Sequence, residues 1–337
     1  MESRSNTASS EVAPAVAPTR PTLSNAALAL IDARCVLCGS DHADPVASGY
    51  DFEYLTVPNT FQFVRCRTCG HHYLNPRPSE ADLGTIYPPN YYAFSGSQQA
   101  LVARVRRSWE AGKVRLYRDL VGAGPRRILD VGCGNGRFLS LLRDYGHAEW
   151  DLVGIDFDAN AVSQCVARGF RAYVSRAEDF APPQGEQFDA VIMLQLIEHV
   201  DDPAAICRRV FTLLRAGGFF IIETPNLAGW DYRLFAGRWW GHYHFPRHWN
   251  LFSTAALHRL LEQSGFAIAR SEYLISTSAW TISLHNYFLD KGYPDWFVRF
   301  FHYQNPLLLG LFVVVDTLRA RLGFQTSNQR VIAQKPR

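Results

Sequence analysis

Three glycines at alternate positions, Gly132, Gly134 and Gly136, directly follow the apolar run "RILDV". Glycine lets the backbone approach a bound molecule closely, so this turn after a buried strand predicts a nucleotide-type ligand. The dinucleotide fingerprint GxGxxG requires its third glycine at position 137, where this chain has Arg137. The spacing GxGxG therefore disfavours a nicotinamide dinucleotide.

Two carboxylates stand where they could contact such a ligand. Asp156 ends the apolar run "DLVGID", and a carboxylate there can accept hydrogen bonds from both hydroxyls of a ribose. A helix-capping role fits Asp158 better, because it immediately precedes the helical segment "ANAV". Asp130 precedes the glycine turn, and we expect it to order the turn or to bind an ammonium group of the ligand.

Four cysteines form two CxxC pairs, Cys35 with Cys38 and Cys66 with Cys69. Two such turns can complete a tetrahedron of thiolates, which predicts a zinc site. A closed four-cysteine site is structural, because no coordination position is left for a substrate. The alternatives are two unconnected pairs of buried thiols or a redox pair, and the lack of a following strand and helix disfavours the redox pair.

His199 and His248 are the candidate general bases, should the reaction need one. His199 follows the apolar run "FDAVIMLQ", and its alternative role is that of a capping or core histidine. His248 lies in "GRWWGHYHFPRHWNLFS", residues 237–253, which is too long and too aromatic for an ordinary connection. We expect this segment to be a lid over the substrate. A hydrophobic plug under the sheet edge is the alternative.

The elements that must position these residues alternate between strand and helix from residue 127 onward. Continuous apolar strands that alternate with helices predict an α/β fold with a doubly wound, mostly parallel sheet. The run "PAAICRRVFTLLRAGG" is expected to be a helix and "FFIIETPN" the following strand. Two final strands, "FAIAR" and "QRVIAQKP", would form an antiparallel pair. Ligands of such sheets bind at the carboxyl ends of the strands, where the glycine turn lies.

The rest of the chain suggests four parts. We expect a disordered tail (1–27), a zinc-ribbon module (28–79), a linker with an amphipathic helix (80–126) and the α/β domain (127–337). The helix carries basic residues between Arg104 and Arg118, which form either a solvated face or a contact with an anionic substrate or lipid headgroup. An apolar insertion (280–324) would be a helical cap over the substrate, a membrane contact through 296–320, or a packing or dimerisation surface.

Composition limits the function. A net charge of +3 over 337 residues disfavours nucleic-acid binding. Neither a secretory signal nor an apolar run of about 18 residues is present, so we expect a cytoplasmic protein, with a peripheral membrane contact as an alternative. Seven cysteines in such a chain argue for thiols or metal ligands, not disulfides. The sequence leaves the oligomeric state open.

The runs "LDVGCGNG", "VGIDFD", "FDAVIMLQLIEHVDDP" and "LLRAGGFFIIETPN" resemble, in order and spacing, the motifs of class I S-adenosylmethionine-dependent methyltransferases. The likeness is stronger to the ubiquinone-biosynthesis O-methyltransferase branch. The cysteine module and "HFPRHWNLFS" resemble a bacterial subset with an N-terminal zinc ribbon, some of whose members methylate sugars or other intermediates. The resemblance implies a Rossmann-like seven-stranded fold and methyl transfer from S-adenosylmethionine to a small sugar, phenol or lipid-linked acceptor.

The resemblance also implies roles for single residues. The three glycines and Asp156 would bind the cofactor, and Asp130 would meet its methionyl ammonium. The family often has an acidic residue before an alanine at the adenine contact. Here Arg176 precedes Ala177, so the backbone of Ala177 or the side chain of Glu178 is expected to make that contact. Gln195 is expected to face the cofactor or the substrate.

In the ubiquinone branch, two carboxylates and a histidine after the fourth strand can bind a divalent cation. This chain has Gln195, Glu198 and His199 there, and the amide weakens a site for a hard cation. We therefore expect no second metal. The alternative functions are a catalytically inactive S-adenosylmethionine-binding module and a nucleic-acid methyltransferase. The latter is disfavoured because no NPPY-like tetrapeptide follows the fourth strand.

Overall fold

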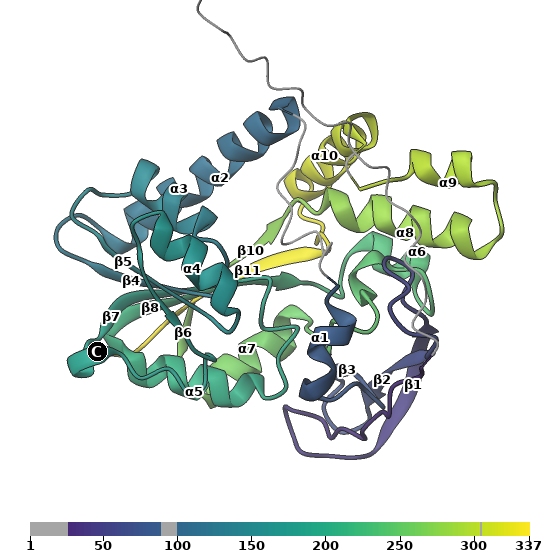
Figure 1. Cartoon of the computed structure of the whole chain (residues 1–337), viewed down its shortest axis with the longest axis horizontal. Coiled ribbons are helices and arrows are strands. Elements are labelled where there is room, and N and C mark those ends of the chain that lie inside the picture. The colour runs from purple at the N-terminus through teal and green to yellow at the C-terminus, as the bar shows by residue number, and fades with distance from the viewer. Residues whose placement is uncertain (1–25, 89–99, 304) are drawn as a thin grey trace, which may run out of the picture.

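The computed structural model describes residues 26–88, 100–303 and 305–337, with the backbone alone for 100–109 and for residue 184. It contains a large α/β body, a small antiparallel sheet and a helical layer beside that sheet (Figure 1). The predicted tail lies almost wholly outside the described residues. The expected basic helical face falls partly on side chains that are also outside them.

The large body is built on a seven-stranded sheet with the order β10-β11-β8-β7-β4-β5-β6. Neighbouring strands from β8 to β6 run parallel, whereas β11 is antiparallel to both β8 and β10. This arrangement confirms the doubly wound, mostly parallel fold and the final antiparallel pair. The strands are β4 (Arg127–Val131), β5 (Asp151–Asp156), β6 (Arg171–Val174), β7 (Phe188–Leu194), β8 (Leu214–Pro225), β10 (Ala267–Leu274) and β11 (Asn328–Gln334).

Two apolar cores cover the two faces of this sheet because successive strand residues point to opposite sides. Ile128 and Ile192 pack toward α2 and α3, whereas Leu129 and Val191 pack toward α5 and α7. The covering helices are α2 (Ala100–Val121), α3 (Arg137–Tyr145), α4 (Ala159–Ala167), α5 (Pro203–Leu213) and α7 (Thr254–Gln263). Short 3-10 turns, η1 (Glu80–Asp82) and η3 (Pro183–Gly185), and the one-turn helix α1 (Leu83–Ile86) lie between these elements.

Polar residues start three of these helices, one of them at Asp158 as the sequence predicts. The side chain of Asp158 accepts hydrogen bonds from the amides of Asn160 and Ala161 at the start of α4. Asp202 and Ser253 cap α5 and α7 in the same manner. The helix starts are therefore fixed locally, and they place the turns that follow the strands.

The small sheet joins two distant parts of the chain in the order β1-β2-β3-β9. Its first three strands, β1 (Ala43–Gly49), β2 (Phe61–Cys66) and β3 (His72–Leu74), lie in the cysteine module. The fourth, β9 (Asn250–Leu251), is the end of the aromatic segment 237–253, which also contains η4 (Gly241–Tyr243). Trp240, Tyr243 and Phe245 of that segment are buried in one apolar cluster with residues of the cysteine module. The expected lid is thus a packed wall whose last strand belongs to the ribbon sheet.

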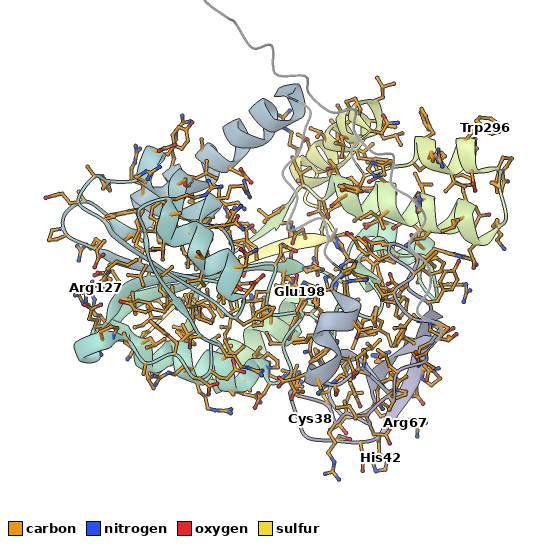
Figure 2. The ribbon with its side chains drawn as sticks, viewed as in Figure 1. Cys38, His42, Arg67, Arg127, Glu198 and Trp296 are labelled. Atoms are coloured by element: carbon orange, nitrogen blue, oxygen red, sulfur yellow. The ribbon has the colours of Figure 1, made fainter. Side chains whose placement is uncertain are left out.

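The apolar insertion is helical. It comprises α8 (Thr277–Asp290), α9 (Asp295–Phe300) and α10 (Pro306–Arg321), and α6 (Trp230–Phe235) packs against α8. Figure 2 places Trp296 of α9 at the outer edge of this layer and Glu198 near the centre of the molecule. Among the described residues, no helix combines the length and apolarity needed to cross a bilayer.

Candidate functional site

The cofactor turn, residues 132–136, connects β4 to α3 at the carboxyl edge of the sheet. Gly132, Gly134 and Gly136 have φ of 77°, 52° and 78°, in the left-handed region that side chains disfavour. A Cβ at Gly136 would lie 2.8 Å from the sulfur of Cys165, whereas a Cβ at Gly134 would meet nothing within 4 Å. Gly136 is therefore required for packing, and Gly134 leaves open space beside the turn.

Asp156, at the end of β5, holds this turn in place. Its Oδ2 accepts a hydrogen bond from the Gly134 amide at 2.9 Å, and its Oδ1 accepts one from the Asp158 amide at 3.0 Å. Burial raises the pKa of Asp156, although these amide donors oppose the shift. A carboxylate has about four acceptor sites, so acceptor capacity remains for a ribose. Asp156 therefore performs the ordering role that the sequence offered to Asp130.

Asp130, at the end of β4, is only 3% exposed, and its Oδ2 has no hydrogen-bond partner among the described residues. Burial and the neighbouring charge of Asp156 raise its pKa to about 7. A buried carboxylate is stabilised by a cation. The orphaned oxygen therefore suits a positively charged group of a ligand, and its contact with the methionyl ammonium of S-adenosylmethionine stays a prediction.

The expected adenine contacts lie beyond β6. Ala177 packs against the core, and Glu178 accepts a hydrogen bond from Nε of Arg176 at 2.7 Å. Arg176 also pairs with Glu80 of η1, so it connects this loop to the linker. The positions of Ala177 and Glu178 do not test whether either residue contacts an adenine, so both contacts stay predictions.

In the loop after β7, Gln195 and Glu198 lie in different environments. Gln195 is exposed, with φ of 52°, and its amide donates to Asn328 at the start of β11. Three residues later the chain turns inward, and Glu198 is fully buried. Gln195 therefore does not join the residues that follow it in this loop.

Glu198, His199 and His248 form one cluster, here called the triad. One ligand-type atom from each residue lies within 4.8 Å of the others. The rings of His199 and His248 are 4.5 Å apart and nearly perpendicular. The structure therefore brings the two candidate bases together across 49 residues of chain, and adds Glu198 to them.

Backbone carbonyls orient both imidazoles. Nδ1 of His248 donates to the carbonyl of His242 at 2.7 Å, and Nδ1 of His199 donates to the carbonyl of Arg247 at 3.1 Å. The hydroxyl of Tyr87 lies 2.8 Å from the same nitrogen of His199. Burial lowers the pKa of His199 to about 3 and that of His248 well below its usual value, so both rings are neutral.

Only one of the two carboxylate oxygens of Glu198 has a hydrogen-bond partner among the described residues. Its Oε2 accepts from the hydroxyl of Thr224 at 2.9 Å, and its Oε1 has no partner among the described residues. Burial raises its pKa to about 8. The backbone carbonyl of Glu198 accepts from the amides of Trp249 and Asn250, which fixes the end of the aromatic wall to this loop.

Sequence reasoning missed several residues of this region. Tyr87 lies in a proline-rich linker, where no pattern indicates its contact with His199. Glu53 of the cysteine module pairs with His244, and Asp51 forms a buried ion pair with Arg247. These contacts join segments about 190 residues apart in the chain, so no local spacing could reveal them.

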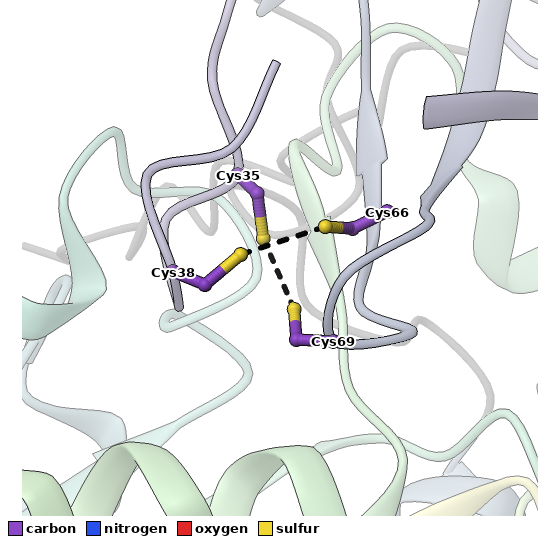
Figure 3. Close-up of side chains that lie close together, drawn as sticks. All are labelled: Cys35, Cys38, Cys66 and Cys69. Carbon is purple, nitrogen blue, oxygen red and sulfur yellow. Dashed lines mark hydrogen bonds between the residues drawn. The ribbon is translucent and has the colours of Figure 1, made fainter. Parts of the chain in front are cut away.

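The four predicted cysteines also converge, with their sulfur atoms all within 4.8 Å of one another (Figure 3). The sulfur atoms of Cys35 and Cys69 are 3.4 Å apart, and those of Cys38 and Cys66 are 3.5 Å apart. Bonds of about 2.3 Å to one tetrahedral zinc ion would separate them by about 3.8 Å. The four thiol donors and the distances between their sulfur atoms therefore fit a zinc ion.

Comparison with known proteins identifies the large body. The methyltransferase domain family matches residues 97–271, just over half of the chain. A ubiquinone biosynthesis O-methyltransferase of Xanthomonas oryzae pv. oryzae is 35% identical over 114 residues, which cover 32% of this chain and 45% of that protein. A probable S-adenosylmethionine-dependent methyltransferase of Mycolicibacterium smegmatis is 30% identical over 148 residues, 42% of this chain and 52% of that protein.

The chain thus spans about half the length of the curated relatives it matches. Among solved structures, a SAM dependent methyltransferase from Archaeoglobus fulgidus is similar at 20% identity and a TM-score of 0.45, covering 68% of this chain and 94% of that one. The matched family region contains the cofactor turn, Asp156 and the triad. The chain therefore belongs to the class I S-adenosylmethionine-dependent methyltransferase family.

Proposed function

We propose that this protein transfers the methyl group of S-adenosylmethionine to a hydroxyl of a small biosynthetic intermediate. The observation that carries the proposal is the open glycine turn flanked by two carboxylates, half-buried Asp156 and buried Asp130, the latter with an oxygen that has no partner among the described residues. This arrangement provides acceptors for a ribose and a counter-charge for a cationic amino acid end. A nicotinamide dinucleotide would not use that counter-charge.

The turn and the two carboxylates beside it would each bind a different part of the cofactor. Asp156 would accept hydrogen bonds from the ribose hydroxyls, and Asp130 would pair with the methionyl ammonium. The open space at Gly134 would admit the cofactor against the backbone. The bound cofactor supplies an activated methyl group on a sulfonium, and the protein mainly holds the acceptor in line with it, which can lower the barrier by roughly 7–11 kcal/mol.

The acceptor would lie between the cofactor turn and the triad. Leu196 touches the turn, because a Cβ on Gly132 would lie 3.0 Å from its side chain. Glu198 and His199 follow within three residues, so they border the same space. The relatives named as ubiquinone biosynthesis O-methyltransferases support an oxygen acceptor, with a phenol, a sugar or a lipid-linked intermediate as its class. His199 and His248 stay the candidate bases.

We further propose that the four cysteines hold a structural zinc ion. Backbone amides of Leu37 and Cys38 point at the sulfur of Cys35, and those of Thr68 and Cys69 point at Cys66. Such amides stabilise thiolates. The ion would brace the module whose strand β3 carries β9 of the aromatic wall.

A lipid surface is a proposed partner of the helical layer. Every exposed position of α10 from 306 to 320 is apolar or glycine, and Leu307 is 74% exposed. Exposed Arg299 on α9 and Arg321 at the end of α10 precede and follow this stretch in the chain and suit an anionic membrane. A lipid-linked acceptor would then reach the protein at the membrane surface.

Calorimetric titration tests the central proposal. S-adenosylmethionine and S-adenosylhomocysteine should bind, and NADH should not. Asp156→Ala should weaken binding at least tenfold, about 1.4 kcal/mol, through loss of charge-assisted hydrogen bonds. Asp179→Ala, an exposed residue beyond β6, is the matched control and should leave affinity unchanged. Binding of NADH without S-adenosylmethionine would refute the proposal.

A further inference from the structure

We propose that Glu53 of the cysteine module and His244 of the aromatic wall form a carboxylate–imidazole pair in which His244 is the general base for the acceptor hydroxyl. Glu53 is a positioning residue, because it acts through the imidazole. The role of the base rests on the proposed function, whereas the pairing and the tautomer of His244 do not. The cysteine module thereby contributes a side chain to the acceptor site.

The two side chains are buried and in direct contact. Nδ1 of His244 lies 2.5 Å from Oε1 of Glu53, and the side chains are 4% and 16% exposed. A carboxylate only accepts hydrogen bonds, so Nδ1 carries the hydrogen and Nε2 presents a lone pair. A carboxylate at this position also stabilises the imidazolium that forms when Nε2 takes a proton.

The backbone of His244 has an unusual conformation. Its φ of 41° and ψ of 47° lie in the left-handed region, which a residue other than glycine enters at a cost. Such residues persist where the surrounding structure fixes them, and they are concentrated at functional sites. Here the amide of Arg247 donates to the carbonyl of His244 at 2.7 Å and holds the turn. The strain is therefore maintained in order to place this imidazole.

A second ion pair, fully buried, aligns the first one. Asp51 stands two residues before Glu53 in the loop after β1. Its partner Arg247 stands three residues after His244. The carboxylate of Asp51 also accepts from the amide and the hydroxyl of Thr56, which fixes the loop that carries Glu53. The docking of the module on the wall therefore sets the position of Glu53 against His244.

His244 forms one cluster with the imidazoles of the triad. Its ring lies 5.0 Å from that of His248 and 6.3 Å from that of His199. Burial lowers the pKa of His199 to about 3, and the charge of His244 is the next cause. Nδ1 of His199 and Nδ1 of His248 contact backbone carbonyls, whereas Nδ1 of His244 contacts a carboxylate. A proton that enters the cluster is therefore better stabilised on His244 than on the two bases that the sequence indicates.

The proposed step conserves atoms and charge. Nε2 of His244 takes the proton of the acceptor hydroxyl. The electron pair of the broken O–H bond forms the new bond from oxygen to the methyl carbon, and the sulfur keeps the pair of the broken carbon–sulfur bond. The positive charge thus moves from the sulfonium to the imidazole, where Glu53 balances it until the proton passes to solvent.

The tautomer of His244 tests the pairing without an acceptor. In protein labelled with ¹⁵N in its histidines, with the signals assigned through His244→Gln, the neutral ring should be the Nδ1–H form. Glu53→Leu should shift it toward the Nε2–H form, which neutral imidazole favours in water. Asp290→Leu is the matched control, because Asp290 also holds the wall, through Arg238 and Trp239, and it should leave the tautomer unchanged.

An Nε2–H ring in the wild type would overturn the inference, and so would an unchanged ring in a Glu53→Leu protein. An unchanged circular dichroism spectrum would show that each variant is folded.

Reaction rates separate the role of a base from a role in packing. With methyl-labelled S-adenosylmethionine and catechol as the probe, Glu53→Gln should lower kcat by about a hundredfold or more, as for the loss of a general base, and leave the KM for S-adenosylmethionine within about twofold. Asp290→Asn should change neither value. A kcat equal to that of the wild type in Glu53→Gln would overturn the role of the base. Lack of transfer by the wild type to catechol and to glucose would count against the proposed function, whereas the tautomer decides the pairing.

Discussion

The cofactor turn and the triad lie at the same edge of the seven-stranded sheet but are assembled differently. The turn and Asp156 lie within 25 consecutive residues, and one strand–turn–helix unit with its next strand positions them. The triad needs the loop after β7, the aromatic wall and the cysteine module that carries the wall. One site is therefore local and the other depends on long-range packing, and the two should respond differently to substitution.

The largest effect is expected where the cysteine module meets the wall. Asp51 and Arg247 are fully buried and paired through two hydrogen bonds of 2.8 and 3.0 Å. Asp51→Ala leaves the guanidinium buried without this carboxylate, which should cost about 3–5 kcal/mol of unfolding free energy. Urea denaturation followed by tryptophan fluorescence measures the loss, because Trp240 and Trp249 lie in that core.

The same variant separates the two sites. If the turn is independent of the wall, Asp51→Ala should change the affinity for S-adenosylmethionine by no more than about twofold while the protein is folded. Asp44→Ala removes a carboxylate from an exposed ion pair with Arg67 and is the control, with no measurable effect expected on either quantity. A tenfold loss of cofactor affinity in Asp51→Ala would contradict the independence of the two sites.

Within the turn, two identical substitutions should have different consequences. Gly136→Ala places a Cβ 2.8 Å from Cys165 at φ of 78°, and should destabilise the fold by about 2–3 kcal/mol. Gly134→Ala meets no atom within 4 Å, so only the backbone strain of about 1 kcal/mol is expected. Thermal melts measure both changes.

Titration with S-adenosylmethionine at low temperature compares the cofactor affinities of the same two variants. Gly134→Ala should weaken binding of S-adenosylmethionine more than its small stability loss suggests, because the new methyl group enters the open space beside the turn. If the two variants lose stability equally and Gly134→Ala binds normally, the assignment of Gly134 to ligand approach is wrong.

These differences explain what the sequence could predict. Some features could be predicted because they depend on residues close together in the sequence. They are the glycine spacing, Asp156 and the CxxC pairs, and the structure places the turn beside Asp156 and brings the four cysteines together. Helix caps at Asp158, Asp202 and Ser253 are local in the same sense. The predicted boundary between α5 and β8 was wrong by several residues: "LRAGG" belongs to β8, in which Leu214 pairs with Phe188. Gly217, with φ of 77°, could not continue a right-handed helix.

Packing between modules could not be predicted. No period or motif links β9 to β3, Asp51 to Arg247, or Tyr87 to His199, since each contact follows from how whole modules dock. The opposite orientations of Gln195 and Glu198 likewise follow from the positive φ at Gln195, which a sequence without glycine there does not indicate.

Glu223, which pairs with Lys113 of α2, is expected to make a pH-dependent contribution to the free energy of unfolding. Burial would raise the pKa of Glu223, but Lys113 and Arg330 outweigh it and hold the pKa below the usual value. A depressed pKa stabilises the fold above the unfolded pKa of about 4.3, and this contribution is lost as the pH falls through the folded pKa. Glu223→Gln should therefore show a flatter decline of unfolding free energy between about pH 5 and 3 than wild type. An equal decline would assign the acid sensitivity to other groups.

The smallest effect on stability is expected on the helical layer, which neither site uses. Leu311 and Leu318 are each 53% exposed on α10, so Leu311→Glu and Leu318→Glu should change the unfolding free energy by less than about 0.5 kcal/mol. Both should nevertheless reduce sedimentation with phosphatidylglycerol-containing vesicles at least tenfold, since a charge replaces apolar surface that enters the interface.

Val166→Glu on α4 is the matched control for this surface, because Val166 is also an exposed apolar residue, 51% exposed, but lies on the α/β body. It should leave vesicle binding unchanged. A wild type that ignores vesicles and elutes as a dimer, with Leu311→Glu eluting as a monomer, would show that α10 pairs with a second copy of the chain. Vesicle binding that is lost in Leu311→Glu and Leu318→Glu but kept in Val166→Glu, with cofactor affinity intact in all three, would show that membrane contact is a third independent property of this protein.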